Sequence, residues 1–401
     1  MSRAGPYPSA DISLRGRQLW AEIDLAAVGR NLAALARQAG PRSRLLAVVK
    51  ANAYGHGALP VARACLAAGV RALGVATVDE GVQLREGGIT AEVLVLGYTP
   101  PGDAERIVAY SLTPTITSKR EALAVAGAAD ARGVVQPVHL KVDTGMHRLG
   151  LAPAEAVPFA QALGELHSLR LEGIYSHFAN ADSGDLSFNR TQFEVFRWTS
   201  DQLPEIKLRH IANTAALFEQ PETALEMVRP GIGVYGYYPS SAVSRPVVLT
   251  PALSLKSRIA RLHTLAPGET VSYNRAWRAE APALIALVPA GYGDGLPRAL
   301  SNRGHVLIRG QRAPIRGRVC MDACLVEVTH ISDVALDDEV VLLGHQRDES
   351  VTIEEWADWS DTIHYEVLCG ISARVPRLYF VGETLVQATS LVGEEDLAPV
   401  H

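Results

Sequence analysis

A lysine that could act as an amine nucleophile stands at the end of a predicted buried strand. Lys50 follows the apolar run Leu45–Val49, which is typical of a fully buried strand in a parallel sheet. In α/β folds, reactive groups lie at the carboxyl ends of such strands. A lysine whose pKa is lowered by burial or by a neighbouring cation reacts with carbonyl groups. Lys50 could instead simply leave the core and extend its ammonium group into water.

Basic and hydrogen-bonding side chains also follow other strand-like segments. Hardly any carboxylate stands among them, so we expect the site to bind an anionic ligand. These residues are Tyr54 after the first predicted strand, Lys141 and Arg148 after the fifth, His177 after the sixth, Asn213 and Thr214 after the seventh, and Arg229 after the eighth.

Two of these loops suit a phosphate group. Asn213–Thr214 and Gly231–Ile232 follow the last two predicted strands, where barrels often bind phosphate through backbone N–H groups and a helix N-terminus. Each pair also has a structural explanation, as a helix cap in one case and a tight turn in the other. A carbonyl-reactive lysine beside a phosphate site indicates pyridoxal phosphate.

The segments that position these residues alternate between strand and helix from about residue 20 to residue 240. Eight strand candidates separated by helical stretches match a (β/α)8 barrel in count and length. An open doubly wound sheet is the alternative, but no GxGxxG sequence follows the first strand. We therefore predict a TIM-type barrel over residues 18–250. Its strands are expected at Leu45–Val49, Ala72–Ala76, Val93–Leu96, Pro114–Thr117, Val134–Val142, Leu171–His177, Lys207–Ile211 and Met227–Ile232.

The sequence changes character after Pro251, where short strand candidates recur with turns between them. Only Thr352–Trp359 is typical of a helix in this part. We therefore predict a second, C-terminal all-β domain over residues 251–393. Trp20–Leu25 also has the pattern of a strand, and the sequence leaves open whether it pairs with the second domain.

Composition argues against several other classes of protein. The chain of 401 residues is 48% hydrophobic with a formal net charge of -5, so nothing indicates a nucleic-acid surface. Its 12 histidines and 4 cysteines show no close metal-ligand pattern and no disulfide framework, and we expect no metal. No run approaches the roughly 18 apolar residues of a membrane span. Residues 1–17 have the composition of a disordered lead-in rather than a signal peptide, so a cytoplasmic protein is expected.

Seven sequence strings, in order, resemble bacterial alanine racemases, which are fold-type III pyridoxal-phosphate enzymes. The first, residues 47–57, reads Ala-Val-Val-Lys-Ala-Asn-Ala-Tyr-Gly-His-Gly and is highly specific. The resemblance covers about residues 18–390 and implies interconversion of L- and D-alanine for peptidoglycan synthesis, by a homodimer with shared active sites. The other strings are Lys141–Met146, Arg229–Gly231, Val271–Tyr273, Gly291–Gly295, Gly317–Asp322 and Tyr365–Val367.

The resemblance implies two catalytic bases. Lys50 would hold the cofactor covalently and work on the D-face of the substrate, and Tyr273 of the partner subunit would work on the L-face. Because racemisation removes a proton from one face and returns one to the other, groups on both faces serve best. A tyrosine with a pKa of about 10 is a poor base near neutral pH. His177 and Arg229 resemble the residues that support it.

The resemblance also implies how the cofactor and substrate are held. Arg229 would face the pyridine nitrogen, keep it unprotonated and so restrict side reactions such as transamination. Arg148 would bond the phenolic oxygen and orient the substrate carboxylate. The phosphate-binding group would comprise Tyr54, Asn213, Thr214, Gly231, Ile232 and Tyr365, and the substrate pocket would be lined across the dimer interface by Tyr292, Met321 and Asp322.

Lys141 and Arg148 would bring two cations together across the turn at Asp143–Gly145. Bare cations in a partly desolvated site repel at a cost on the order of several kcal/mol. Carbamylation of neutral Lys141 would give an anion matched to the guanidinium, and the resemblance points to the same modification. Asp143 could supply the compensating charge instead.

Three residues depart from the family pattern. Thr214 stands where serine is common, Asn274 where glycine often follows the tyrosine, and His147 where a small residue is found.

Three other functions need to be weighed. A decarboxylase of the same fold type would carry an acid in place of Arg229. A barrel-only pyridoxal-phosphate carrier would lack the second domain. A broad-specificity amino-acid racemase is harder to dismiss.

Overall fold

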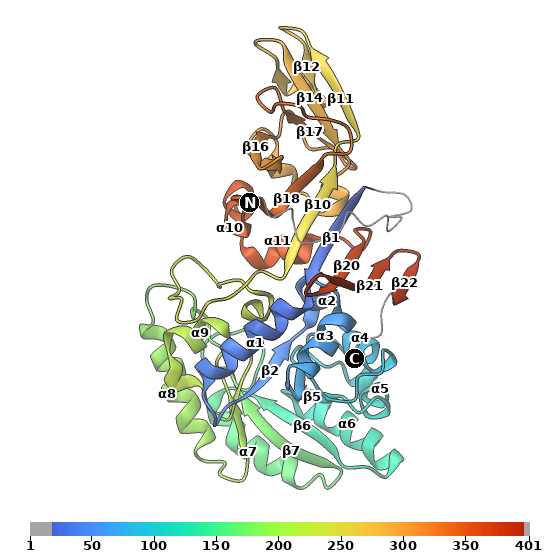
Figure 1. Cartoon of the computed structure of the whole chain (residues 1–401). Coiled ribbons are helices and arrows are strands. Elements are labelled where there is room, and N and C mark those ends of the chain that lie inside the picture. The colour runs from blue at the N-terminus through green and yellow to red at the C-terminus, as the bar shows by residue number, and fades with distance from the viewer. Residues whose placement is uncertain (1–17, 397–401) are drawn as a thin grey trace. The chain divides into compact units, whose positions relative to one another are not determined.

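The computed structural model describes residues 18–396 (Figure 1), and the predicted lead-in at residues 1–17 lies outside them. The chain divides into two compact units, of which one is Ala27–Thr250 and the other joins the first strand to the residues from Pro251 onward. That first strand, β1 (Leu19–Asp24), pairs antiparallel with β10 (Leu253–Arg258) and parallel with β20 (Arg377–Val381). Its backbone therefore belongs to the C-terminal unit and not to the barrel, which had been expected to begin at residue 18.

The unit Ala27–Thr250 contains eight parallel strands in the order β8-β7-β6-β5-β4-β3-β2-β9, with β2 paired to both β3 and β9. The predicted (β/α)8 barrel is thereby confirmed. Its strands are apolar and largely buried, as expected when helices cover the outer face of a parallel sheet. They are β2 (Arg44–Val48), β3 (Ala72–Val75), β4 (Glu92–Val95), β5 (Thr113–Ile116), β6 (Gln136–Lys141), β7 (Leu169–Tyr175), β8 (Leu208–His210) and β9 (Met227–Val228).

Local sequence signals fix several barrel helices. The side chains of Thr77 and Ser118 each accept a hydrogen bond from the backbone N–H of the residue three positions later. That residue is a glutamate, whose carboxylate accepts the backbone N–H of the threonine or serine. The two bonds form capping boxes at the starts of α4 and α6. Helix α6 ends at Gly133, which adopts a left-handed conformation with φ of 64°. The helices are α1 (Leu25–Ala39), α2 (Lys50–Tyr54), α3 (Ala58–Ala67), α4 (Val78–Glu86), α5 (Ala104–Ala109), α6 (Lys119–Arg132), α7 (Pro153–Gly164), α8 (Ser187–Ser200) and α9 (Thr214–Glu219).

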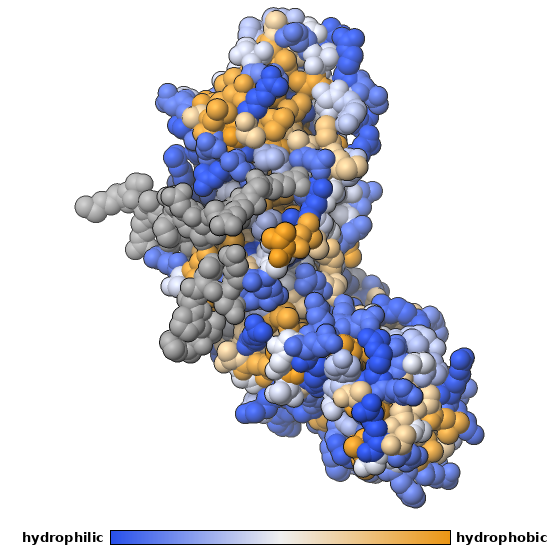
Figure 2. Space-filling model, turned by 90° about the vertical axis from the view of Figure 1, so that its right-hand side faces the viewer, coloured by the Kyte–Doolittle hydropathy of each residue, from blue (hydrophilic) through white to orange (hydrophobic). Residues whose placement is uncertain are grey.

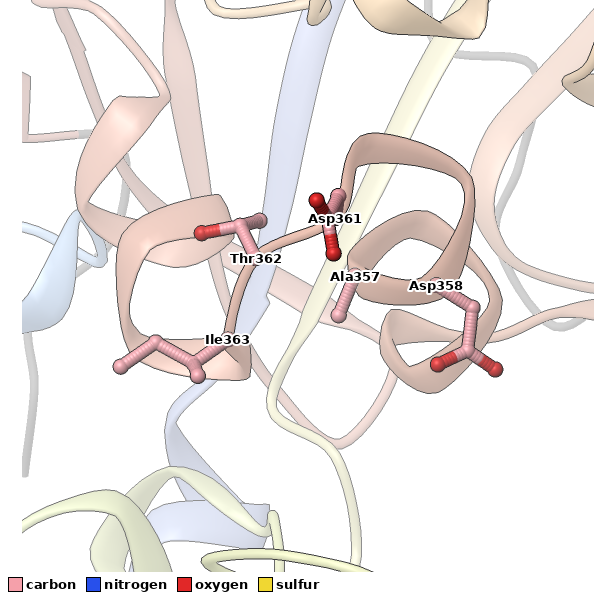
Figure 3. A pocket seen from close by; sticks show the side chains of 5 residues that line it. All are labelled: Ala357, Asp358, Asp361, Thr362 and Ile363. Atoms are coloured by element: carbon pink, nitrogen blue, oxygen red, sulfur yellow. The ribbon is translucent and has the colours of Figure 1, made fainter.

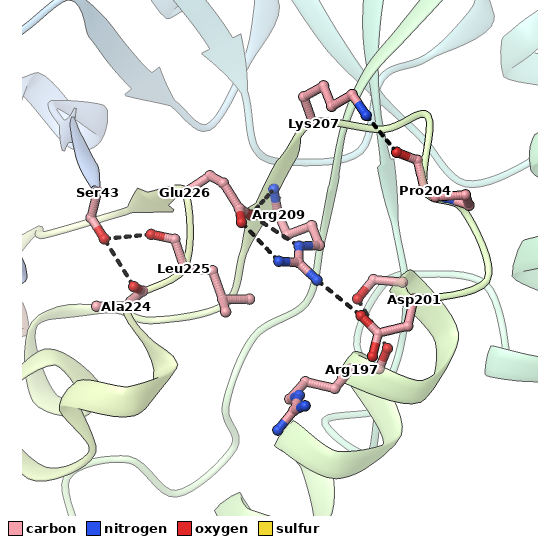
Figure 4. A network of polar contacts seen from close by, with 10 residues as sticks. Ser43, Arg197, Asp201, Pro204, Lys207, Arg209, Ala224, Leu225 and Glu226 are labelled. Atoms are coloured by element: carbon pink, nitrogen blue, oxygen red, sulfur yellow. Dashed lines mark hydrogen bonds and ion pairs between the residues drawn. The ribbon is translucent and has the colours of Figure 1, made fainter.

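Side chains join β8 to the chain before β9, at the end of the barrel where these strands begin (Figure 4). Arg209 donates from Nε and Nη2 to the two carboxylate oxygens of Glu226, at 3.0 and 2.8 Å, and from Nη1 to Asp201 at 2.9 Å. Such a bidentate pair fixes geometry more firmly than a single contact. Since β9 spans only two residues, this pair helps to hold Arg229, which follows directly.

The C-terminal unit is built around a nine-stranded sheet in the order β16-β15-β18-β10-β1-β20-β21-β22, with β19 paired to β18. A three-stranded sheet, β11-β14-β17, and the pair β12-β13 complete the predicted all-β architecture. The predicted helix is α10 (Ile353–Ser360), and α11 (His364–Gly370) follows it. The further strands are β11 (Arg261–Leu265), β12 (Thr270–Val271), β13 (Trp277–Arg278), β14 (Ala283–Val288), β15 (His305–Ile308), β16 (Gln311–Pro314), β17 (Cys324–Glu327), β18 (Glu339–Gln346), β19 (Glu349–Val351), β21 (Thr384–Ser390) and β22 (Gly393–Asp396).

The part of this unit that contains β11 to β14 has a small core of its own. On the face drawn in Figure 2, hydrophobic residues also gather at the surface of this part. None of the helices described in residues 18–396 is long and apolar enough to cross a membrane. The buried residues of this core are Leu265, Val271, Ala279, Ala283 and Ile285.

Candidate active site

Lys50 lies two residues beyond the end of β2, at the start of an unusual turn. Residues 51–54 all have φ angles between 51 and 53°, so four consecutive non-glycine residues are left-handed. Each such residue costs roughly 1–2 kcal/mol, and hydrogen bonds from other parts of the chain offset some of this cost. Glu80 accepts the backbone N–H of Ala51 at 2.7 Å, and Nδ1 of the buried His56 lies 2.9 Å from the carbonyl oxygen of Tyr54. Strain of this kind is typical of functional sites.

This turn carries Tyr54 against Gly231, which follows β9. A Cβ atom on Gly231 would lie 2.5 Å from the Tyr54 hydroxyl oxygen, so a larger residue here would displace the tyrosine. Thr214 accepts the backbone N–H of Gly231 at 3.1 Å, which leaves its hydroxyl proton for another acceptor. The N–H groups of Thr214 and Ile232, at the starts of α9 and a 3-10 turn, have no acceptor within residues 18–396, as is usual in a first turn.

Hydroxyl and N–H donors of this kind can bind an anion, and the phosphate site itself stays a prediction. The side chain of Asn213 has a different use, because its Oδ1 caps α9 by accepting the N–H of Ala216 at 2.9 Å. Asn213 therefore shapes the loop, which is the structural explanation that the sequence also allowed.

Arg229 is buried and surrounded by acceptors. Its guanidinium donates to the carbonyl oxygens of Ser176 at 2.7 Å and Ile211 at 3.1 Å. It also lies 2.8 Å from Nδ1 of His210 and 3.1 Å from Nδ1 of His177. Because arginine can only donate, both imidazoles accept at Nδ1 and carry their proton on Nε2. Burial lowers the pKa of Arg229 to about 10, which leaves it a cation near neutral pH.

The network continues into the barrel interior. Nε2 of His210 lies 2.9 Å from Nδ1 of His139, so the first ring donates to the second. Burial and then Arg229 lower the pKa of His210, while burial lowers that of His139 to about 3. The ring of Tyr175 stacks on His210 with 4.7 Å between centroids, and its hydroxyl bonds to Thr115 at 2.7 Å. All these imidazoles are therefore neutral, and Arg229 is held by uncharged groups.

Lys141 lies at the end of β6 and is also buried. Burial first, and then Arg229 and Arg148, lower the pKa of its amine to about 8. Its Nζ lies 5.3 Å from the ring centre of Tyr175. Asp143 accepts two backbone N–H groups of the turn that follows it, at 2.9 and 3.0 Å. This carboxylate therefore stabilises the turn. Arg148 in the same loop is exposed, yet it lies near enough for its charge to lower the pKa of Lys141.

The remaining predicted residues belong to the C-terminal unit. Tyr273 begins a 3-10 turn and is 68% exposed, while Tyr292 is 43% and Met321 53% exposed. Asp322 accepts a hydrogen bond from Arg374 at 2.7 Å, and the half-buried Tyr365 lies in α11.

Two of the departures from the family pattern have a backbone explanation. Asn274 has a φ of 60° and His147 a φ of 55°, so both adopt the left-handed conformation. Glycine adopts this conformation readily, and asparagine and histidine are the side chains enriched in it. Both residues therefore hold the backbone in a conformation that a glycine could also adopt.

A shallow pocket in the turn between α10 and α11 is a poor alternative site (Figure 3). Asp358 and Asp361 contribute two carboxylates to its lining, which would repel an anionic cofactor. None of the residues predicted to bind the cofactor lines it. Within the described part of the chain, no three histidine, cysteine or acidic side chains are grouped so that they could hold a metal ion.

Known proteins resemble this chain over both of its units. The family model described as alanine racemase, N-terminal domain, matches residues 23–239, and that of the C-terminal domain matches residues 252–379. An alanine racemase of Halothermothrix orenii is 42% identical over 90% of this chain and 97% of its own length. One of Desulfosudis oleivorans is 45% identical over 91% of this chain and 97% of its own length.

Solved structures give the same result. An alanine racemase of Clostridium difficile 630 superposes with a TM-score of 0.89 at 38% identity, covering 93% of this chain and 98% of its own. An alanine racemase of Bartonella henselae, named as carrying covalently bound pyridoxal phosphate, has a TM-score of 0.82 at 29% identity, covering 90% and 99%. With both domains matched and relatives aligned over nine-tenths of its length, the chain belongs to the alanine racemase family.

Proposed function

We propose that the chain is a cytoplasmic enzyme that interconverts L- and D-alanine with pyridoxal 5'-phosphate and supplies D-alanine for peptidoglycan synthesis. The observation that supports this proposal is the turn that begins at Lys50 at the end of a barrel strand and carries Tyr54 against Gly231, whose backbone N–H is bonded to Thr214. The relatives named above are alanine racemases, and one is named with the cofactor bound. When bound, pyridoxal phosphate makes the α-proton of an amino acid removable.

The residues of the barrel fit this cofactor. The hydroxyls of Tyr54 and Thr214 and the N–H group of Ile232 would hold its phosphate, with Gly231 leaving room for the tyrosine. Tyr365, from the other unit, is proposed as a further phosphate ligand. Arg229 would face the pyridine nitrogen as a donor, because a guanidinium can only donate hydrogen bonds and its pKa of about 10 keeps it charged.

Two bases on opposite faces of the substrate would move the proton. Lys50 would take or return it on the D-face, and Tyr273 on the L-face. His177 supports the tyrosine in this proposal, because Arg229 fixes its Nδ1 as an acceptor and leaves the Nε2–H to donate. Arg148 would bind the substrate carboxylate, since a guanidinium matches the planar fork of a carboxylate.

We further propose that the active unit is a homodimer in which each site takes residues from both chains. Support comes from the exposure of Tyr273, Tyr292 and Met321, which would become buried against a second copy. Asp322 lies beside Met321 and would join the same pocket.

The proposal is tested with purified protein and L-alanine, L-serine and L-lysine as substrates. The D-enantiomer formed from each is measured with a stereospecific oxidase. We expect L-alanine to give the highest kcat/KM and Lys50→Ala to abolish racemisation in both directions. A higher kcat/KM for L-serine or L-lysine would replace the proposal with a broad-specificity racemase, and no racemisation of any of the three would refute it.

A further inference from the structure

Two loops of the C-terminal unit are tied together at their backbones. One is the 3-10 turn Tyr292–Asp294, and the other contains Met321. The N–H of Tyr292 donates to the carbonyl oxygen of Cys320 at 3.0 Å, and the N–H of Gly293 donates to that of Met321 at 2.9 Å. The exposed side chains of Tyr292 and Met321 are thus presented by one joint structure.

Arg374, between α11 and β20, binds both loops. Its Nε donates to Oδ1 of Asp294 at 2.7 Å, while Nη2 donates to the carbonyl oxygen of Met321 at 3.1 Å and to Oδ1 of Asp322 at 2.7 Å. Asp294 is buried, and its other oxygen accepts the N–H of Gly291 at 2.8 Å. A buried carboxylate needs such partners, so Arg374 completes the turn that carries Tyr292.

The backbone leaves room for this guanidinium. A Cβ atom on Gly293 would lie 2.5 Å from Nη2 and 2.8 Å from Cζ of Arg374, and one on Gly291 would lie 2.3 Å from the carbonyl oxygen of Met321. The guanidinium therefore lies directly against the glycine turn. The guanidinium reaches Asp294 from one nitrogen and Met321 and Asp322 from another. A lysine has only one nitrogen, so it cannot span all three acceptors in this way.

We infer that Arg374 is a positioning residue of the substrate pocket, which fixes Met321 and Tyr292 relative to each other. This rests on the proposed role of those two side chains. Without the guanidinium, two backbone hydrogen bonds would remain between loops whose side chains are exposed. The loops would then move apart, and alanine would bind less well while the residues around Lys50 stayed unchanged.

The test compares Arg374→Met and Arg374→Lys with Arg309→Met in the cofactor-loaded enzyme. Arg309 is a matched control, because it donates from Nε and Nη2 to Asp338 in the same unit at 2.7 and 3.1 Å and contacts neither loop. KM and kcat for L-alanine, cofactor absorbance, and hydrogen exchange of peptides covering 291–295 and 320–323 are measured. Arg374→Lys serves where Arg374→Met does not fold.

Arg374→Met should raise KM about tenfold, as expected for the loss of charge-assisted hydrogen bonds, with kcat and cofactor absorbance nearly unchanged. Both peptides should exchange faster, and Arg374→Lys should be intermediate. Unchanged exchange, faster exchange with unchanged KM, or the same effects in Arg309→Met would each overturn the inference. If the wild-type protein fails to racemise alanine, the proposed function fails, whereas the exchange data still report whether Arg374 holds the loops.

Discussion

The guanidinium of Arg229 lies 3.1 Å from Nδ1 of His177, and this contact fixes the tautomer of the imidazole. The proton must sit on Nε2, since Nδ1 accepts. Burial and Arg229 both lower the pKa of His177, so the ring stays neutral through the physiological range. The Nε2–H of His177 is therefore a neutral hydrogen-bond donor with several cations nearby. Hydrogen bonds and positive charges lower the pKa of a tyrosine, so these surroundings would favour the tyrosinate form of the proposed base.

Arg229→Lys should lower both activity and stability, because lysine cannot reach two carbonyl oxygens and two imidazoles at once. We expect kcat to fall at least about tenfold and the free energy of unfolding to fall by about 1–3 kcal/mol for each buried acceptor left unsatisfied. Urea unfolding and racemisation of L-alanine measure the two effects.

Arg85→Lys is the matched control for this substitution. Arg85 also donates to four carbonyl oxygens, those of Tyr110, Ile89, Ala91 and Ser111, but lies outside the proposed site. It should lose stability while keeping kcat. An equal loss of kcat in both variants would mean that Arg229 acts only through stability.

Tyr273→Phe should separate the two proposed bases. The α-deuteron of D-alanine should still exchange with solvent, because Lys50 is untouched, while that of L-alanine should not. Proton NMR follows both exchanges, with Tyr110→Phe as a control that removes a hydroxyl bonded to Glu86 elsewhere in the barrel. Equal loss of exchange for both enantiomers would contradict the division between faces.

Mixing the inactive Lys50→Ala and Tyr273→Ala variants should restore part of the activity. Some mixed dimers would then contain one complete site, if each site draws on both chains. Subunit exchange is verified by native mass spectrometry of differently tagged chains. Proven exchange without any recovery of activity would rule out a shared site.

Lys141 should be carbamylated in the active enzyme. Its pKa of about 8 leaves much of the amine neutral at slightly alkaline pH, and only the neutral amine reacts with carbon dioxide. Asp143 raises the pKa of Lys141, but by less than either Arg229 or Arg148 lowers it, so this carboxylate offsets only part of the positive charge. Lys141→Ala should lose activity that acetate partly restores. High-resolution electron density that shows an unmodified ammonium at Lys141, salt-bridged to Asp143, in a fully active enzyme would defeat the idea.

The sequence predicted the barrel because each strand is a short apolar run followed by a turn, and the strand-end residues could be read from that order. It did not assign the relay of His139 and His210. Side chains alternate between the two faces of a strand, and His139 stands two residues before Lys141 in β6. This spacing places His139 on the same face as Lys141 and could have indicated its place in the network.

Other features depend on contacts between distant segments. The left-handed turn at residues 51–54 depends on Glu80, and Arg374 contacts Asp294 from 80 positions away. The pairing of β1 with β10 joins residues more than 200 positions apart. Local patterns carry little information about such contacts, because tertiary packing decides them.

The central claim is that Lys50 holds pyridoxal phosphate, and chemical trapping tests it most directly. The purified protein is reduced with borohydride, digested, and mapped by mass spectrometry, with Lys50→Ala treated in parallel. The account predicts a phosphopyridoxyl group on the peptide that contains Lys50 and none on the variant. The same group on Lys141 or another lysine, with Lys50 unmodified, would contradict it.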